Sequence, residues 1–314
     1  MIPINKLKQI KGFRGALYRL DQLRKRTAYA AHAATDFVAL RREQNGHKPL
    51  VAAVVVGRND DYMSDFRERL EATLEWNIRH LVDEAIFVEW NPPPDRPLLG
   101  PVLAARFSNL RAYVVPPEIH LAICENKNIP LLEYHAKNVG IRRAKAPWII
   151  STNADAAFGL DSVRAILNSE LSPQVAWTTQ RADINWREGR QSAFKLSDAM
   201  SYKRVSRYHP LGTGEFCLAS RDLWHNIGGY DELMVRHRVG CDVRGTAQML
   251  AHGAEIRKAG LVLHLAHPTS CSEGMQPHHG EAATIEGVPY HNPDDWGLGN
   301  RREVQLEERV WRLE

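Results

Sequence analysis

An unbroken run of apolar residues over 51–56 constrains the fold more than any other segment of this 314-residue chain. The run is far shorter than the roughly 20 residues that a membrane-spanning helix needs. It also carries no polar side chain that could face water on either side of a strand. Such a segment is typical of a strand buried on both faces, as in a parallel sheet covered by helices. The sequence therefore predicts an α/β domain.

The segments that follow alternate between helical and strand patterns. A helix is expected over 61–81, because Phe66, Leu70, Leu74 and Ile78 recur every four residues. Further strands are expected over 85–90, 112–115, 148–152, 175–179 and 261–265, and further helices over 131–145, 220–227 and 242–252. A polar linking region is expected up to about residue 210. This alternation predicts a Rossmann-like sheet, which binds ligands at the carboxyl ends of its parallel strands.

Composition excludes several classes of protein. With 44% hydrophobic and 25% charged residues, the chain is neither disordered nor collagen-like. Its four cysteines contain no Cys-x-x-Cys pair, so reduced thiols are expected rather than a zinc ribbon or a disulfide framework. No apolar segment is long enough for a membrane span or a secretory signal, and a cytoplasmic location is therefore expected.

Residues 1–48 form a basic arm with eleven Lys and Arg against three acidic residues. Two interpretations stay open for a helix in this arm: peripheral contact with an anionic membrane surface, or packing on the main domain or on a second subunit. Nucleic acid is not expected, because no aromatic residues are interleaved to stack bases. The apolar residues at helical spacing are Leu7, Ile10, Leu17, Leu20 and Leu23.

The most informative segment covers residues 137–155, where a helical pattern leads into a buried strand and then to Asp155. Hard divalent cations such as Mg²⁺ and Mn²⁺ take oxygen ligands and share them with substrate phosphates. Asp155 is therefore the first candidate for a metal ligand. The alternative is a carboxylate that only caps the following turn.

The pattern Asn-x-Gly-Ile-x-x-Ala, a hydrophobic strand and then x-x-Asp resembles the nucleotide-sugar half of GT-A glycosyltransferases of the family 2 type. This resemblance implies a GT-A fold, with a mostly parallel central sheet and helices on both faces. It also implies that Asp155 holds a divalent metal, Mn²⁺ or Mg²⁺, that bridges the donor diphosphate. The family has Asp-x-Asp at this point. Here Asn153 replaces the first Asp, and its amide can also bond to the sugar or ribose.

A second resemblance covers residues 214–232 and 240–253, which are similar to the C-terminal region of galactosyltransferase-like members. It implies that Asp242 is the base that accepts the proton of the acceptor hydroxyl. Cys241 stands where the family has Glu. Physically, a carboxylate at a helix N-terminus is stabilised as the anion and can be directed into a cleft. The alternative is an N-cap that only starts the helix.

The third match is the strand over 261–265 with two histidines three positions apart, His264 and His267. In the resembling enzymes, a histidine just past such a strand completes the metal site. His267 is the first choice on this ground and His264 the second. Imidazole ligands suit Mn²⁺ better than Mg²⁺.

The resemblance also implies residues that contact the nucleotide-sugar donor. Glu89 is expected to face the base or ribose. Lys137 or Arg143 is expected to meet the diphosphate. The complete set expected at the donor is Asn59, Asp60, Glu89, Lys137, Asn138, Arg143 and Asn153.

Four parts are expected along the chain: a basic helical arm (1–48), the nucleotide-sugar-binding half (49–160), the acceptor or catalytic half (161–273) and a C-terminal loop and tail (274–314). The loop contains His278 and His279, and two interpretations stay open for it: a mobile loop that closes over the donor, or a disordered tail. Together these features predict a metal-dependent inverting glycosyltransferase. It would move a sugar from a nucleotide-sugar, with UDP-sugar favoured, to a hydroxyl of a carbohydrate or glycolipid acceptor in polysaccharide synthesis.

Three other functions stay open. A sugar-1-phosphate nucleotidylyltransferase needs a glycine-rich basic loop after the first strand, whereas the loop over residues 57–61 is short and acidic. A metallohydrolase would use the four histidines at 264, 267, 278 and 279, whose spacing fits no helical zinc motif. A catalytically degenerate domain would bind a nucleotide-sugar or a membrane partner without turnover.

Overall fold

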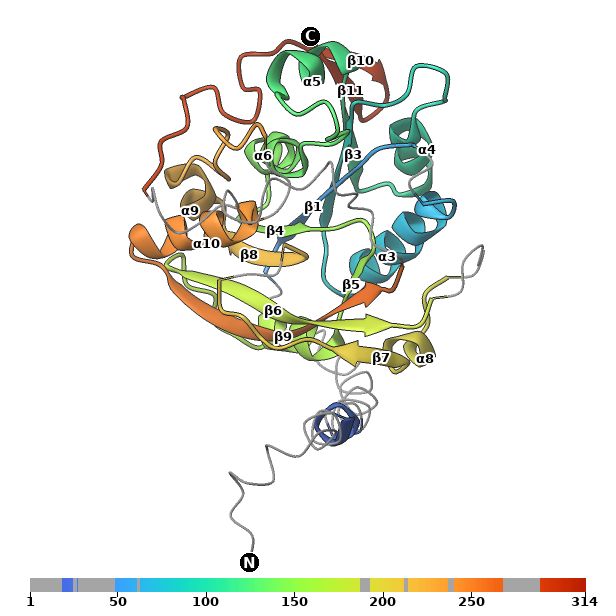
Figure 1. Ribbon diagram of the computed structural model, residues 1–314, viewed down its shortest axis with the longest axis vertical. Helices are drawn as coiled ribbons and strands as arrows, with labels where there is room; N and C mark the ends of the chain where they lie inside the picture. The colour runs from blue at the N-terminus through green and yellow to red at the C-terminus, as the bar shows by residue number, and fades with distance from the viewer. Residues whose placement is uncertain are drawn as a thin grey trace, which may run out of the picture.

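One mixed sheet runs through the molecule, with helices on both faces (Figure 1). The computed structural model describes residues 19–24, 27, 49–60, 63–186, 193–211, 214–236, 240–267 and 289–314. Within these residues the sheet has 11 strands in the order β10-β11-β3-β2-β1-β4-β8-β6-β9-β5, and β7 pairs with β6. The predicted α/β class is confirmed.

One half of the sheet is parallel throughout. Its strands are β11 (Val310–Leu313), β3 (Leu110–Val115), β2 (Glu84–Trp90), β1 (Val51–Gly57) and β4 (Trp148–Thr152). Every residue of β1 is buried, as the apolar run predicts. This half carries the strand ends at which the sequence predicts the donor site.

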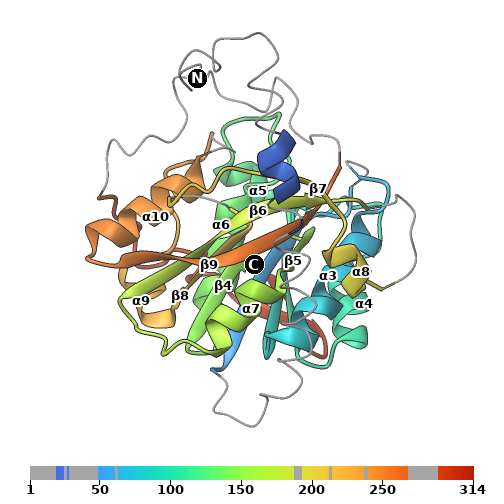
Figure 2. The same ribbon diagram turned by 90° about the horizontal axis from the view of Figure 1, so that it is seen from below.

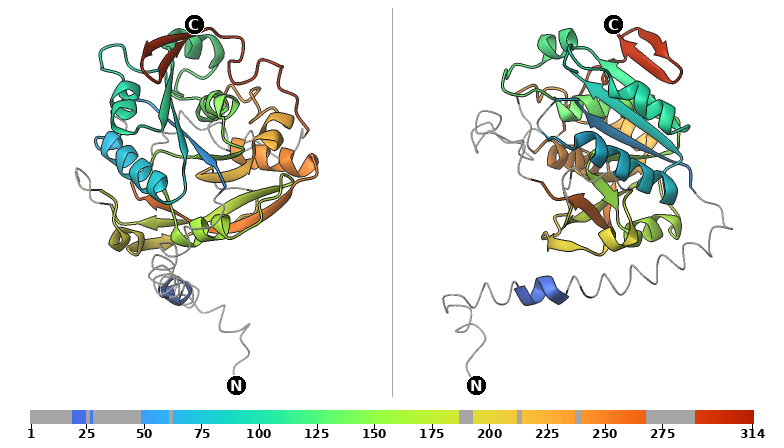
Figure 3. Two further views of the ribbon diagram at one scale, coloured as in Figure 1. Left: turned by 180° about the vertical axis from the view of Figure 1, so that it is seen from behind. Right: turned by 90° about the vertical axis from the view of Figure 1, so that its right-hand side faces the viewer.

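Alternate residues of β1 face two separate cores. Val51, Ala53 and Val55 pack with residues of α3 (Phe66–His80) and α4 (Leu99–Arg106). The residues between them pack with α6 (Glu133–Arg143) on the other face. Figure 1 shows α6 across the sheet from α3 and α4, and the right-hand view of Figure 3 looks onto the face that α3 and α4 cover. Burying each valine stabilises the fold by about 1.5–3 kcal/mol. A polar residue anywhere in this strand would therefore face a core.

The glycine of the Asn-x-Gly-Ile pattern has a packing role. Gly140 lies on α6 against β1, and a Cβ atom at this position would come within 2.4 Å of Val54 Cγ1. Only a residue without a side chain lets the helix approach the strand so closely. This close packing fixes α6 against the middle of β1 and, through Ile86, against β2.

The other half of the sheet is mixed. It contains β8 (Phe216–Ser220), β6 (Val175–Ile184), β9 (Glu255–Leu265), β5 (Ala156–Phe158) and β7 (Tyr202–Val205). β9 lies between β6, to which it is parallel, and β5, to which it is antiparallel; β6 and β9 run side by side in Figure 2. A side chain on β9 therefore has neighbours from two strands that are distant in sequence.

Beyond the helical residues 19–24, five further helices are described: α5 (Pro117–Ile123), α7 (Leu160–Leu167), α8 (Leu196–Ala199), α9 (Arg221–Asn226) and α10 (Cys241–Ala251). The side chain of Ser220 caps α9 by accepting a bond from the Leu223 N–H at 3.0 Å. α9 and α10 contribute to the same core as α6. None of the described helices has the length and apolar character needed to cross a bilayer.

The sequence does not predict several short elements, among them β5, β7 and the helices α4, α5, α7 and α8. It also places only a loop and tail after residue 274, whereas β10 (Glu303–Glu307) and β11 form a hairpin that extends the sheet. Val310 and Leu313 are 0% exposed and anchor this hairpin. The boundaries of the four parts stay a prediction.

Most of the basic arm and residues 268–288, with His278 and His279, lie outside the described residues. Residues 19–24 are helical, and the Gln22 amide bonds to both backbone groups of Val205 on β7, at 3.0 and 2.7 Å. Leu20 and Leu23 on this helix are 63% and 59% exposed. Three of the cysteines, Cys124, Cys217 and Cys241, are free thiols, as predicted.

Candidate metal centre and its surroundings

Strand pairing brings Asp155 and His264 together. Ala156, the first residue of β5, is the register partner of His264 on β9. The Leu265 N–H donates to the Asp155 carbonyl at 2.9 Å, which fixes the residue before β5 against the end of β9. His267 follows two residues after β9 ends. Three residues that span more than 100 positions therefore meet at one place.

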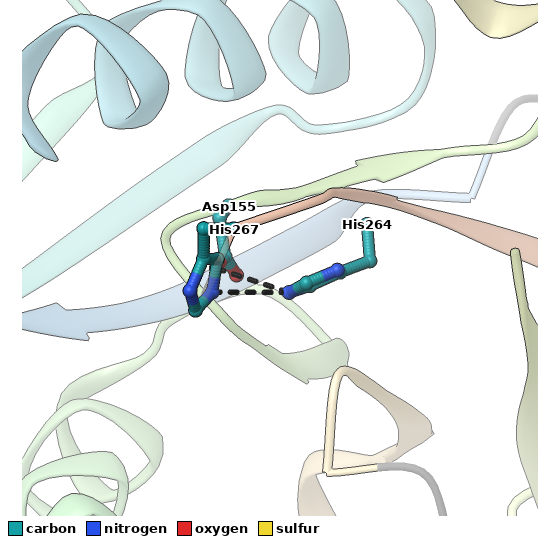
Figure 4. Close-up of side chains that lie close together, drawn as sticks. All are labelled: Asp155, His264 and His267. Carbon is teal, nitrogen blue, oxygen red and sulfur yellow. Dashed lines mark hydrogen bonds and ion pairs between the residues drawn. The ribbon is translucent and has the colours of Figure 1, made fainter. Parts of the chain in front are cut away.

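The three side chains converge on a common point (Figure 4). The Asp155 Oδ2 atom lies 2.9 Å from His267 Nε2 and 3.3 Å from His264 Nε2, and the two Nε2 atoms are 3.3 Å apart. All three atoms lie within 4.8 Å of one another and could hold a metal ion. One carboxylate and two imidazoles form a donor set that suits Mn²⁺ better than Mg²⁺.

The electrostatics of this group favour a cation. Burial opposes the charged form of Asp155, but the charge and hydrogen bonds of His264 and His267 outweigh it and hold the pKa of Asp155 well below its usual range. Burial likewise disfavours charged His264, yet Asp155 and then Asp183 raise its pKa to about 9. The site therefore stabilises positive charge beside Asp155. Protonated His264 supplies that charge here, and a bound cation could supply it instead.

A second set of charged groups surrounds His264. Its Nδ1 atom lies 3.0 Å from Asp183 Oδ1 and 2.8 Å from Arg181 Nη2. Arg181 also donates to Glu215 Oε1 at 2.7 Å. The sequence motifs assign no role to these three residues. For Arg181 and Asp183, the signal in the sequence is a pair of charged residues two positions apart in the β6 segment, which continues to Ile184 rather than ending near 179.

Asp242 is the second residue of α10 and lies near the same charged groups. A Cβ atom at Gly214 would be 3.6 Å from Asp242 Oδ2. Burial, and after it the charge of Glu215, raise the pKa of Asp242 against the opposing effects of the Val243 N–H and Lys137. Glu215 also accepts from Arg181, which contacts His264, so Asp242 and His264 both lie near the Arg181–Glu215 pair.

Lys137 is 0% exposed and connects three elements. Its Nζ atom donates to Glu133 Oε1 at 2.7 Å, to Asn153 Oδ1 at 2.7 Å and to the Gly214 carbonyl at 2.8 Å. An ammonium group has three N–H donors, and all three are used here. In this arrangement Lys137 positions Asn153 and Gly214 and has no N–H left to donate to a diphosphate.

Glu89 is completely buried and has a structural partner. Its two oxygens accept bonds from the Leu99 and Gly100 N–H groups, each at 2.9 Å, at the start of α4. Burial raises its pKa to about 7, although the two backbone N–H bonds act in the opposite direction. The expected contact with a base or ribose therefore needs correction: this carboxylate caps a helix and is closed to a ligand.

The structure does not bring Asn138 to the Asp155 group either. The Asn138 Oδ1 atom accepts from the Tyr230 N–H at 2.7 Å, and its Nδ2 atom donates to the Tyr230 carbonyl at 2.8 Å. Gly229 has a φ of +74°, and a Cβ atom there would lie 2.4 Å from Asn138 Oδ1. Asn138 thus holds the Gly-Gly-Tyr turn in place, and the expected donor contact is corrected.

Arg143 lies at the opposite edge of the sheet. It is the last residue of α6, and the chain from there enters the start of β4, whereas Asp155 follows the end of that strand. Its guanidinium donates to the Gly297 carbonyl and to Glu303 Oε1, both at 2.7 Å. Arg143 therefore holds the C-terminal segment, and its expected contact with the diphosphate is wrong.

Asn59 and Asp60 follow the carboxyl end of β1, which lies beside β4 in the sheet. The Asn59 Nδ2 atom donates to the Pro97 carbonyl at 3.0 Å, and Asp60 pairs with Arg58 at 2.6 Å. Both residues are half-buried. Their expected contact with a nucleotide stays a prediction.

Neither a protein-family model nor a curated protein sequence matches the chain. Among solved structures, the chain is similar to GalNAc-T7 with UDP, GalNAc and Mn²⁺, with a TM-score of 0.49 and 11% identity over 70% of this chain and 44% of that one. It is also similar to the mannosyltransferase PcManGT from Pyrobaculum calidifontis in complex with GDP-Man and Mn²⁺ (TM-score 0.44, 17% identity, 77% and 67% coverage). A third similar structure is the inositol-1-phosphate CTP transferase from T. maritima (TM-score 0.42, 8% identity, 73% and 94% coverage).

Proposed function

We propose that this chain is a metal-dependent inverting glycosyltransferase that moves a sugar from a nucleotide-sugar, with UDP-sugar favoured, to a hydroxyl of a carbohydrate or glycolipid acceptor. The observation that carries the proposal is the convergence of Asp155, which follows the parallel strand β4, with His264 and His267 at the end of β9; Asp242 lies near Glu215, which is joined to His264 through Arg181. These residues come from the three motifs that resemble GT-A glycosyltransferases, in the order that the resemblance implies.

The metal would be held by Asp155 Oδ2, His264 Nε2 and His267 Nε2, whose donor chemistry fits Mn²⁺. When bound, it would stabilise the negative charge that develops on the leaving diphosphate. Asn153, two positions before Asp155, would contact the sugar or ribose through its amide nitrogen, since its oxygen accepts from Lys137. The buried ammonium group of Lys137 adds positive charge beneath this part of the site.

Asp242 would act as the general base. Its raised pKa makes the carboxylate a better proton acceptor than an exposed aspartate. As the acceptor oxygen forms a bond to the anomeric carbon, the bond from that carbon to the diphosphate oxygen breaks, and the hydroxyl proton passes to Asp242. Attack from the face opposite the diphosphate inverts the anomeric configuration. General-base catalysis of this kind contributes about 10²- to 10⁴-fold.

The test is Asp242→Asn in the full chain, with release of UDP from a panel of UDP-sugars measured in Mn²⁺ together with the Kd for UDP. We expect turnover to fall by about two orders of magnitude or more while UDP binding changes little. Asp222→Asn is a matched control, because Asp222 is likewise the second residue of a helix, α9, but is exposed. This variant should leave both quantities unchanged.

Near-normal turnover in Asp242→Asn would remove this residue from the role of base. A wild-type chain with neither turnover nor Mn²⁺-dependent UDP binding would favour a catalytically degenerate domain. Formation of pyrophosphate from a nucleoside triphosphate and a sugar-1-phosphate would instead favour a nucleotidylyltransferase.

A further inference from the structure

Two contacts at one nitrogen of His264 exclude each other. Asp183 Oδ1 lies 3.0 Å from His264 Nδ1 and can only accept a hydrogen bond, whereas Arg181 Nη2 lies 2.8 Å from the same atom and can only donate one. Nδ1 therefore bonds either to Asp183, as an N–H donor, or to Arg181, as a lone-pair acceptor. The two cases give His264 opposite chemistry at its other nitrogen.

Metal binding at Nε2 requires the first case. When Nδ1 carries the proton of neutral His264, Nε2 presents its lone pair toward Asp155 and His267. When Nδ1 accepts from Arg181, the proton lies on Nε2, and His264 cannot bind a metal there. The partner of Nδ1 therefore decides whether the cluster has two or three ligands.

We propose that Asp183 is a positioning residue that selects the metal-binding tautomer of His264 and that Arg181 holds Asp183 for this purpose. This inference rests on the metal site of the proposed function. Carboxylates that accept from the second nitrogen of a metal-bound histidine fix its tautomer and its ring orientation. Nothing in the sequence motifs assigns a role to either residue.

The sheet builds this arrangement. His264 on β9 is the register partner of Asp183 on the neighbouring strand β6, and of Ala156, next to Asp155, on the other neighbour, β5. One carboxylate thus stands on each side of the imidazole, at Nδ1 and at Nε2. The two backbone registers, and not side-chain flexibility, place them there.

Arg181 has other acceptors that free it from His264. Its Nε atom donates to Asp183 Oδ1 at 2.8 Å and its Nη1 atom to Glu215 Oε1 at 2.7 Å. Asp183 Oδ1 can accept from both Arg181 Nε and His264 Nδ1, since a carboxylate oxygen has two lone pairs. Arg181 therefore connects the metal-site histidine to Glu215, whose charge acts on Asp242.

The experiment measures Mn²⁺ affinity by calorimetry in the full chain without donor, and Nδ1 protonation of His264 by ¹⁵N NMR of the Zn²⁺-loaded chain with labelled histidine. We expect Asp183→Ala to weaken Mn²⁺ binding about 10- to 100-fold and to remove the protected Nδ1–H signal. Asp183→Asn should lose less affinity, because its amide oxygen can still accept from Nδ1. The His264 signal is assigned with His264→Gln.

Two further variants separate positioning from general stability. Asp83→Asn alters another half-buried aspartate that accepts from a neighbouring strand, at the Val51 N–H, and should leave Mn²⁺ affinity unchanged. Arg181→Gln removes the competing donor to Nδ1, so its loss of affinity should be smaller than that of Asp183→Ala. Circular dichroism and Tm establish that each variant is folded.

The outcomes distinguish this inference from the proposed function. If the wild-type chain binds Mn²⁺ through Asp155 but Asp183→Ala binds it equally well with the Nδ1–H signal intact, the positioning role is overturned and the metal site stands. An equal loss in Arg181→Gln and Asp183→Ala would also overturn the selection of one tautomer. If the wild-type chain binds no Mn²⁺, the metal site itself fails.

Discussion

The ends of β2 and β4 each place a buried carboxylate at the same edge of the sheet, but the two carboxylates have opposite properties. Glu89 is 0% exposed and accepts from two neutral backbone N–H groups, and burial raises its pKa to about 7. Asp155 is 8% exposed and contacts two imidazoles, which overcome burial and keep its pKa well below the usual range.

The difference shows that position at a strand end does not by itself define a ligand site. Backbone N–H groups satisfy the oxygens of Glu89 and fix α4, so this carboxylate is part of the scaffold. A protonated imidazole donates an N–H and a positive charge to Asp155, whereas a neutral one can offer its lone pair to a metal ion, so the carboxylate and the imidazoles can share a cation. The partners, more than the strand, decide the chemistry.

The largest expected effect is on metal binding. Asp155→Ala should weaken Mn²⁺ binding by more than about 100-fold, since even the outer partners of metal ligands are worth 10- to 100-fold. Glu89→Gln should leave the affinity unchanged, because Glu89 lies outside the cluster. Calorimetric titration of both variants with Mn²⁺ checks this contrast. Similar losses in the two variants would mean that the two strand ends do not differ in function.

The next effect is on stability and belongs to Glu89. Its folded-state pKa of about 7 lies above its ordinary value of 4.5, so between these pH values the unfolded chain has released the proton and the folded chain has not. The free energy of unfolding should therefore fall by about 3 kcal/mol from this group as pH rises from 4.5 to 7, and then level off.

Urea unfolding of the wild-type chain and Glu89→Gln at several pH values isolates this contribution. The difference between the two chains should change with pH in that window only. Asp161, whose pKa burial also raises to about 7, is present in both chains and cancels. A difference that is constant between pH 4.5 and 7 would show that Glu89 ionises normally.

A third effect couples metal binding to pH. The pKa of His264 is about 9 in the metal-free chain, so its proton must leave before Nε2 can bind a metal. Mn²⁺ affinity should therefore rise up to about tenfold per pH unit below pH 9. In the metal-free chain, the free energy of unfolding changes with pH in the opposite direction to the Mn²⁺ affinity. The raised pKa of His264 stabilises the fold below pH 6.5, and this contribution is lost as pH rises toward 9.

Mn²⁺ titrations at pH 6, 7 and 8 measure this slope. His264→Gln should bind the metal more weakly and with a flatter dependence on pH. A wild-type affinity that does not change over this range would show that His264 is already neutral in the metal-free chain.

The smallest expected effect comes from the far edge of the sheet. Arg143→Ala removes hydrogen bonds to the Gly297 and Leu298 carbonyls and should lower the free energy of unfolding by about 1 kcal/mol. It should not change Mn²⁺ or UDP affinity, because Arg143 is remote from the strand ends. Urea unfolding and UDP titration measure the two quantities. A loss of UDP affinity in a folded variant would contradict the placement of Arg143.

Much of the parallel half could be predicted from the sequence, because residues 51–56 and the strands after them carry continuous apolar runs. The short strands could not: β5 has three residues, and β10 and β11 contain charged side chains that hide their pairing. Such strands form because a neighbouring edge is available, which depends on the rest of the fold.

The candidate site was predictable to a similar degree. Motif order identified Asp155, His264 and His267, and the structure brings these three side chains together. It missed Asp183 and Arg181: these two charged residues stand two positions apart in the β6 segment, but only the register of β6 against β9 joins them to His264. It misplaced Glu89 for a related reason, since the start of α4 that faces this carboxylate has no sequence signal of its own.

The pairing of β11 with β3 has a consequence for synthesis of the chain. Ala112 and Val310 are register partners although about 200 positions separate them. At about 5–20 residues per second, a ribosome needs about 10–40 s to make that stretch, and during this time β3 has an open edge. An uncovered strand edge is a template for aggregation. The edge of β3 therefore stays uncovered until the hairpin of β10 and β11 has been made.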